Sequence, residues 1–129
     1  MADIIKNIAP SNTPIICAQL TAATQATESI KLISDDGLIV WKNVLCQIVV
    51  AGITTNVVVR LRGSLDNVNW FNLDEGDSDI TYTANGTFGI QWEGFGDINY
   101  VDLYFVSEAG GTVATLDVQF KVFGGRGEV

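Results

Sequence analysis

Hydrophobic and polar residues alternate with a period of two in several short stretches of the chain. In Ala114–Val122, apolar residues occupy every even position and polar or charged residues every odd one. A similar alternation occurs in three further segments, Val57–Leu61, Phe88–Trp92 and Val101–Phe105. A period of two predicts antiparallel strands that bury one face and leave the other in water.

Turn-forming residues separate these stretches at short intervals. A glycine stands in each of seven clusters, at 35–37, 51–52, 63–64, 75–77, 85–86, 94–96 and 110–111. Asn85-Gly86 predicts a type I′ turn that joins Ile80–Thr83 to Phe88–Trp92 as a hairpin. Strands that recur every 8–12 residues or so indicate a sandwich or a barrel. We therefore expect an all-β fold, an antiparallel β-sandwich of about eight strands that is Ig-like or jelly-roll-like.

Two segments do not follow the period of two. Leu38–Val50 is nearly all apolar. It is either one strand covered on both faces, for instance by a neighbouring subunit, or two short strands joined near Lys42-Asn43. Leu20–Ile30 is the only helix candidate, although its threonines are poor helix formers and its apolar spacing is weak.

The two ends of the chain differ from its middle. Residues 1–13 mix polar and apolar side chains around Pro10, and we expect them to form an extended arm. Residues 125–129 belong to a glycine-rich tail that we expect to be mobile. Residues 14–124 remain for one sandwich domain, and a chain of 129 residues has no room for a second domain of ordinary size.

The composition excludes several kinds of chemistry. The chain has no histidine, which excludes Ser-His-Asp and Cys-His catalysis and zinc sites that use histidine. Cys17 and Cys46 are too few for a cysteine-rich zinc cluster, and they stand in apolar runs either as buried thiols or as a disulfide between two strands. The formal net charge of −8 disfavours nucleic acid as a partner.

Membrane insertion and secretion are not indicated either. No apolar run approaches the ~20 residues that a membrane span requires. The first ten residues, MADIIKNIAP, do not resemble a signal peptide, because they have no basic leader and Lys6 and Asn7 interrupt their apolar stretch. We expect a protein that is made in a cytoplasm and has no membrane partner.

Four carboxylates crowd around a glycine turn, at Asp74, Glu75, Asp77 and Asp79. Oxygen ligands of this kind suit calcium, but the spacing of an EF-hand is absent. A glycosidase needs two carboxylates across a cleft, which one turn does not provide. No glycine cluster matches a phosphate-binding pattern. We therefore predict no catalytic residue, no cofactor and no metal site, and a protein that is not an enzyme; calcium binding by the acidic loop stays an open alternative.

The stretch Arg60–Leu73 contains two arginines on one face of a predicted strand. Strand parity places Arg60 and Arg62 outward, two residues apart. There they can pair with carboxylates on a neighbouring strand, for example Asp102 or Asp117, or with a partner subunit. The run of turn-forming residues that follows reads first as a strand–turn–strand.

Aromatic residues offer a second candidate surface. Tyr100 and Tyr104 fall on the polar face of their strand and form a row on which a sugar can stack. The alternative is that most aromatic rings fill the core while the tyrosines edge it, with their hydroxyls in water. Trp70 and Phe71 have opposite parity, so one points inward and the other points outward or toward a partner.

The sequence RLRGSLDNVNWFNL at Arg60–Leu73 resembles a phrase found in small β-sandwich proteins of tailed-phage particles. The phrase is a strand, then Gly-Ser-x-Asp-Gly, then two residues and Trp, then an apolar strand; Asn67 stands where it usually has Gly. Tyr100–Gly124 also resembles the closing hairpin of such proteins, so the resemblance covers about half of the chain. Discoidin-type domains, which bind glycans or lipids, share a similar phrase but are usually longer and often extracellular.

The phage resemblance implies a virion structural protein without an active site. We expect a non-enzymatic capsid decoration or auxiliary protein, located in the virion, that binds the major capsid protein or other virion proteins as a homo-oligomer. The arm 1–13 and the face of Arg60 and Arg62 are expected to take part. Apolar burial and strand addition to a neighbouring sheet edge are the expected means of attachment.

Three alternatives have different signatures. A carbohydrate-binding module of a fibre or adhesin, with a glycan as its ligand, would use Tyr100, Tyr104 or the loop around Trp70. A tail-tube or connector subunit would polymerise into rings or tubes when purified. A small hydrolase would use the carboxylates of Asp74–Asp79.

Overall fold

Nine strands and the turns between them make up the described part of the chain. The computed structural model describes residues 15–16, 19–33, 40–73, 79–94 and 98–123. No helix occurs within these ranges, and the predicted arm 1–13, the predicted tail 125–129 and Cys17 lie outside them. The strands are β1 (Ile15–Ile16), β2 (Ile30–Lys31), β3 (Asn43–Ala51), β4 (Asn56–Ser64), β5 (Phe71–Asn72), β6 (Ile80–Tyr82), β7 (Gly86–Glu93), β8 (Tyr100–Ala109) and β9 (Thr115–Phe123).

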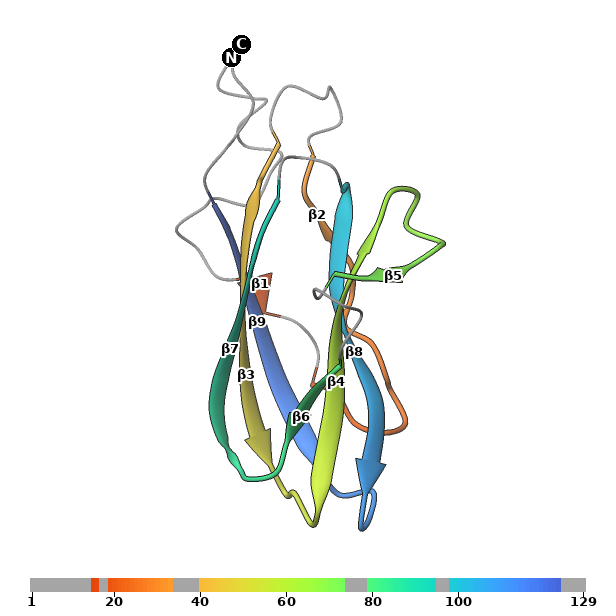
Figure 1. Cartoon of the computed structure of the whole chain (residues 1–129), viewed down its shortest axis with the longest axis vertical. Coiled ribbons are helices and arrows are strands. Elements are labelled where there is room, and N and C mark those ends of the chain that lie inside the picture. Colours follow the sequence, from red (N-terminus) through yellow and green to blue (C-terminus); the bar gives the residue numbers. More distant parts are fainter. Residues whose placement is uncertain (1–14, 17–18, 34–39, 74–78, 95–97, 124–129) are drawn as a thin grey trace.

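The strands form two antiparallel sheets that pack face to face (Figure 1). One sheet has the order β1-β9-β3-β7. The other has the order β2-β8-β4, with β5 and β6 both paired along the remaining edge of β4, so that these two short strands share one position. An Ig-like sandwich keeps its last two strands side by side in one sheet, whereas β8 and β9 lie in opposite sheets here. The predicted antiparallel sandwich is confirmed, and its topology is that of a jelly roll.

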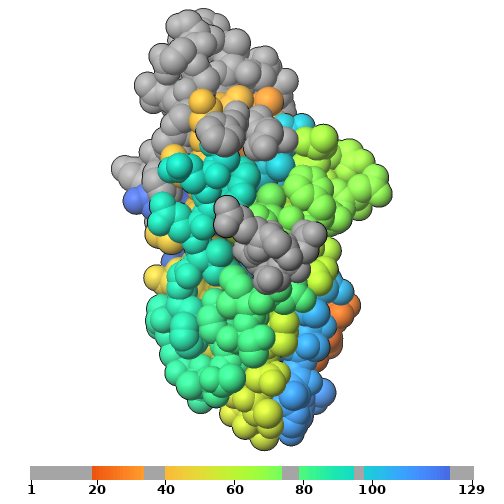
Figure 2. Space-filling model, in the orientation of Figure 1, coloured from red at the N-terminus to blue at the C-terminus, as the bar shows by residue number. Residues whose placement is uncertain are grey.

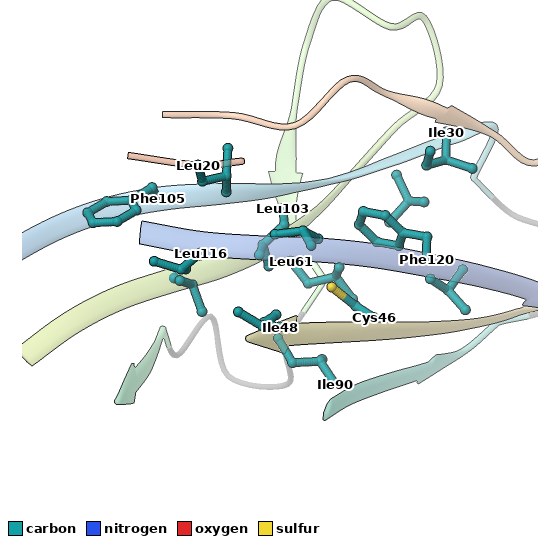
Figure 3. Close-up of a cluster of buried hydrophobic side chains, with 14 of the residues drawn as sticks. Leu20, Ile30, Cys46, Ile48, Leu61, Ile90, Leu103, Phe105, Leu116 and Phe120 are labelled. Atoms are coloured by element: carbon teal, nitrogen blue, oxygen red, sulfur yellow. The ribbon is translucent and has the colours of Figure 1, made fainter. Parts of the chain in front are cut away.

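The core lies between the two sheets and is formed by the apolar side chains at alternate positions of the strands. In β3 and β4 the side chains alternate between buried and exposed or half-buried along most of the strand, as the period of two predicts. Figure 3 shows the two layers meeting, with Cys46 and Ile48 from β3, Leu61 from β4, Leu103 from β8 and Phe120 from β9. Each fully buried Leu, Ile or Phe stabilises the fold by about 1.5–3 kcal/mol relative to an exposed one.

The predicted hairpin at Asn85-Gly86 is wrong. β6 pairs with β4 and β7 pairs with β3, so the Asn-Gly pair lies where the chain crosses from one sheet to the other. Asn85 lacks the positive φ that a type I′ turn requires. Its Oδ1 instead accepts a hydrogen bond of 2.9 Å from the backbone N–H of Ile53. The rings of Tyr82 in β6 and Phe88 in β7 stack on each other with their centroids 4.2 Å apart, so they connect the two sheets where the chain crosses.

The helix candidate Leu20–Ile30 is not a helix, and its chain crosses from one sheet to the other. It bridges first to β9 and then to β8, with a turn between the two bridges. The hydroxyl of Thr24 accepts a hydrogen bond of 2.8 Å from the backbone N–H of Thr21 in that turn. Threonine hydroxyls that bond to nearby backbone groups in this way compete with the backbone hydrogen bonds of a helix. The segment also gains backbone hydrogen bonds to β8 and β9, which it could not form as a helix.

Of the apolar segment Leu38–Val50, the part from Asn43 onward forms one long strand, β3, which begins at the predicted junction near Lys42-Asn43, and residues 38–39 lie outside the described residues. Val40 forms an isolated bridge with Ile33, and β3 begins three residues later. Because side chains along β3 alternate between buried and exposed, this strand covers the core with one face only in the described chain.

Gly52, in the β3–β4 turn, lies against the β8–β9 turn. Its φ is +76°, and a Cβ there would stand 2.7 Å from the carbonyl oxygen of Val113. We expect Gly52→Ala to lower the free energy of unfolding, measured in urea, by about 2 kcal/mol, because alanine is strained at this φ and must displace a backbone oxygen. Gly89→Ala is the control, since its Cβ would have no heavy atom nearer than 3.9 Å. Equal losses for the two variants would contradict this reasoning.

Candidate functional site

The two arginines of β4 lie on the outer face of their sheet, as strand parity predicts. Val57, Val59 and Leu61 are buried between the sheets, while Arg60 and Arg62 are half-buried on the opposite face. β8 runs antiparallel beside β4 along its full length, so the outward side chains of β8 reach the same face.

Arg62 is held by one carboxylate and two aromatic rings. Its Nε and Nη2 donate hydrogen bonds of 2.9 Å and 2.6 Å to Oδ1 and Oδ2 of Asp102, which is a bidentate geometry. Its Cζ lies 4.3 Å from the ring centroid of Tyr104 and 4.9 Å from a ring centroid of Trp70, within cation–π range. We call Arg62, Asp102, Trp70 and Tyr104 the arginine brace. The brace ties β4 to β8 and to the segment that leads into β5.

Asp102 faces outward but is only 2% exposed. Burial raises the pKa of Asp102 above its ordinary value of 3.8, and the hydrogen bonds and charge of Arg62 oppose that rise without cancelling it. A carboxyl with a raised pKa in the folded state binds its proton more readily there than in the unfolded chain. Its contribution to stability therefore falls as the pH rises from 3.8 through the folded pKa. At neutral pH the pair fixes geometry at an energetic cost, as buried ion pairs often do.

Arg60 holds a different carboxylate, Asp79, which the sequence analysis assigned to the acidic loop. Its Nε and Nη2 donate hydrogen bonds of 2.7 Å and 3.1 Å to the two carboxylate oxygens of Asp79. The hydrogen bond from Arg60 lowers the pKa of Asp79. The prediction that outward carboxylates pair with the arginines is right for Asp102 and wrong for Asp117, because Asp117 lies on β9 in the other sheet and accepts a hydrogen bond of 2.8 Å from Gln19.

The Gly-Ser-x-Asp part of the sequence phrase is a turn that caps itself. Ser64 is buried, and its Oγ accepts hydrogen bonds from the backbone N–H groups of Asp66 (3.3 Å) and Asn67 (2.9 Å). Asp66 Oδ1 accepts from the backbone N–H groups of Val68 (2.9 Å) and Asn69 (2.8 Å). Asn67 has φ +63°, a conformation that glycine adopts most easily and that asparagine tolerates better than most residues. This conformation explains why asparagine can stand where the phrase usually has glycine.

The backbone hydrogen bonds from Asn69 and Val68 hold the pKa of Asp66 far below its ordinary value of 3.8. A depressed folded pKa means that the stabilisation is present above pH 3.8 and is lost as the pH falls toward the folded pKa. We expect Asp66→Asn to be less stable than the wild type in urea unfolding at neutral pH. The difference should shrink steadily as the pH is lowered below about 4. A difference that stays constant down to low pH would show that the charge of Asp66 does not hold the turn.

The turn and the start of β5 carry apolar side chains in solvent. Leu65 is 57% exposed, Val68 is 74% exposed and Phe71 is 46% exposed, and we call these three residues the apolar loop. The other large apolar side chains with comparable exposure in the described chain are spread over β3 and the β8–β9 turn. The segment between β4 and β5 extends outward from the sandwich (Figure 1) and forms a lobe on its surface (Figure 2). Exposed apolar side chains on a protruding segment whose backbone is held by hydrogen bonds offer a contact surface to another macromolecule.

The remaining sequence candidates do not join the brace or the apolar loop. Asp74, Glu75 and Asp77 lie outside the described residues, so calcium binding by the acidic loop stays an open alternative. The residues that are described contain no group of three or more potential metal ligands. Tyr100 and Tyr104 are both half-buried on β8, and the ring of Tyr104 lies against the guanidinium of Arg62; glycan stacking on these tyrosines stays an alternative. Among the same residues, no helix is long and apolar enough to span a membrane.

Comparisons with known proteins give one distant structural likeness. No protein-family model and no curated protein matches the chain. The crystal structure of the SPBc2 prophage-derived protein YomS is similar with a TM-score of 0.49 and 13% sequence identity, over 91% of this chain and 100% of that one. A likeness this distant does not bear on the function of the chain.

Proposed function

We propose that this chain is a non-enzymatic structural protein of a tailed-phage particle, a capsid decoration protein that attaches to the surface of the head. The observation that carries the proposal is the apolar loop. Leu65 and Val68 are exposed on a turn that Ser64 and Asp66 fix with hydrogen bonds, and Phe71 is exposed at the start of β5, where it pairs with Gly63. A turn that is already ordered loses little conformational entropy when a partner covers it, so apolar burial translates efficiently into affinity.

The two arginine–carboxylate pairs of β4, Arg60–Asp79 and Arg62–Asp102, support a binding role over a catalytic one. Arg60 and Arg62 each donate two hydrogen bonds to one carboxylate. Bidentate pairing engages the charged groups with each other, so they position strands and loops and are poorly placed to act as acid, base or nucleophile. Trp70 packs on Arg62 next to the apolar loop, so the brace anchors the base of that loop to the sheet.

The proposed partner is the major capsid protein, with an apolar depression that receives the loop. A net charge of −8 favours a partner surface that presents basic groups around this depression, because opposite charges steer association. The copies are homo-oligomeric in this proposal, so that several weak contacts on a regular lattice add by avidity. The phage resemblance of Arg60–Leu73 supports a particle protein, and jelly rolls also form viral capsid domains. In this proposal the chain is made in the host cytoplasm and ends in the virion.

The test uses particles of a phage whose genome encodes this chain. Heads and tails are separated on a density gradient, and the chain is quantified in each fraction by mass spectrometry. We expect it in the head fraction, in a fixed ratio to the major capsid protein. Recovery in the tail fraction would favour a tail-tube or connector subunit, and absence from both fractions would refute a virion role.

A further inference from the structure

The edges of the two sheets differ greatly in length. β1, β2 and β5 each have two residues and β6 has three. β7, at the free edge of the β1-β9-β3-β7 sheet, has eight. Very short edge strands prevent unwanted strand pairing, because they present few free backbone groups. β7 is therefore the edge in the described chain on which a further strand can pair over its full length.

β7 also lacks the side chains that usually block pairing. Its sequence, GTFGIQWE, contains no proline and no lysine, and its one charged residue is Glu93 at the end. Phe88 and Trp92 point toward the core but stay half-buried at the rim of the sandwich. A strand added to β7 would cover these two rings in addition to pairing with the backbone.

We propose that β7 pairs antiparallel with β7 of a second copy of this chain, about a two-fold axis at Gly89. The sequence complements itself around that axis. Phe88 then lies opposite Ile90 of the second copy on the core side, an aromatic–β-branched pair that stabilises sheets. Thr87 lies opposite Gln91 on the outer side.

The charges and the space at the axis fit the same arrangement. Glu93 falls beyond the paired segment, opposite Asn85 of the second copy, so no two like charges face each other. A Cβ at Gly89 would be 3.9 Å from the carbonyl oxygen of Cys46 and 4.0 Å from Cδ1 of Leu45, so the crossing point carries no side chain and is uncrowded on its own side. The two four-stranded sheets then join into one continuous sheet.

This inference rests on the homo-oligomeric part of the proposed function. Its test needs no phage particle, so its failure is distinguishable from a failure to bind heads. Multi-angle light scattering on the purified full chain, from micromolar to submillimolar concentration, should give a dimer. Thr87→Lys with Gln91→Lys places lysine opposite lysine at both outer pairs, and we expect the mass to fall twofold, to that of the monomer. Thr87→Lys with Gln91→Glu places opposite charges there and should keep the dimer.

Thr115→Lys with Gln119→Lys is the matched control. These residues have the same types and spacing and lie on the outer face of β9, an interior strand of the same sheet, so the dimer should persist. Far-UV circular dichroism establishes that each variant is folded. A wild type that stays monomeric, or a lysine pair on β7 that leaves the dimer intact, would overturn the proposal. So would loss of the dimer on removal of residues 1–13, because the arm would then be the strand that occupies the edge.

Discussion

Replacing Arg62 by alanine should lower the free energy of unfolding by about 3–5 kcal/mol. Asp102 is 2% exposed, and its two carboxylate oxygens receive their hydrogen bonds from Arg62. Without Arg62 the carboxyl must either stay charged without a partner or bind a proton, and both outcomes disfavour the folded state at neutral pH. The rings of Trp70 and Tyr104 lose their contact with the guanidinium as well. Urea unfolding at neutral pH, followed by tryptophan fluorescence, measures the loss.

Two further variants separate the pair from its surroundings. Arg60→Ala should cost about 1 kcal/mol or less, because the Arg60–Asp79 pair is more exposed, with side-chain exposures of 35% and 26%. Arg62→Met combined with Asp102→Leu should recover most of the stability lost in Arg62→Ala, since it removes both buried charges together. Similar losses for Arg62→Ala and Arg60→Ala would contradict the role assigned to the brace.

Replacing two residues of the apolar loop by aspartate should abolish tight binding to phage heads. Leu65→Asp with Val68→Asp places charges where we propose that apolar surface is buried, and the loss of central contacts in an interface typically weakens binding by about 100-fold or more. Both side chains are more than half exposed in the free protein, so the fold should be retained. The dissociation constant is measured by co-sedimentation of the purified chain with heads that lack it.

Val113→Asp is the matched control for the loop. Val113 is also an exposed valine, at 66%, but it lies in the β8–β9 turn, which is next to the β3–β4 turn and thus at the other end of β4 from the loop. We expect Val113→Asp to bind heads as the wild type does. If both variants bound equally well, the apolar loop would not be the contact surface. If both lost binding equally, general charge repulsion would be the better explanation.

The fold class could be predicted because successive side chains of any β-strand point to opposite faces, so a half-buried strand leaves an alternation of apolar and polar residues in its own sequence. The even positions of Ala114–Val122 are buried, and Arg60 and Arg62 lie outward, as parity requires. Parity is a local property, so it does not say which sheet a strand joins. For this reason the sequence could predict that Asp102 is a possible partner of the arginines, but it could not decide between Asp102 and Asp117.

The errors arose where tertiary pairing overrides local preference. Asn85-Gly86 has the residue types of a tight hairpin, but the jelly-roll topology separates β6 from β7 into different sheets, and the pair becomes a crossing. The apolar loop was missed for a different reason. Leu65 and Val68 stand in a run of turn-forming residues, where an apolar side chain is itself a signal of exposure. That signal becomes clear only when Ser64 and Asp66 are seen to fix the turn.

A cryo-electron microscopy reconstruction of the head of the phage that encodes this chain tests the central claim most directly. The claim is that the braced apolar loop attaches the sandwich to the capsid. We predict density for the jelly roll on the outer surface of the head, with Leu65, Val68 and Phe71 buried against the major capsid protein. A head without this density, or a bound sandwich whose apolar loop faces solvent, would contradict the claim.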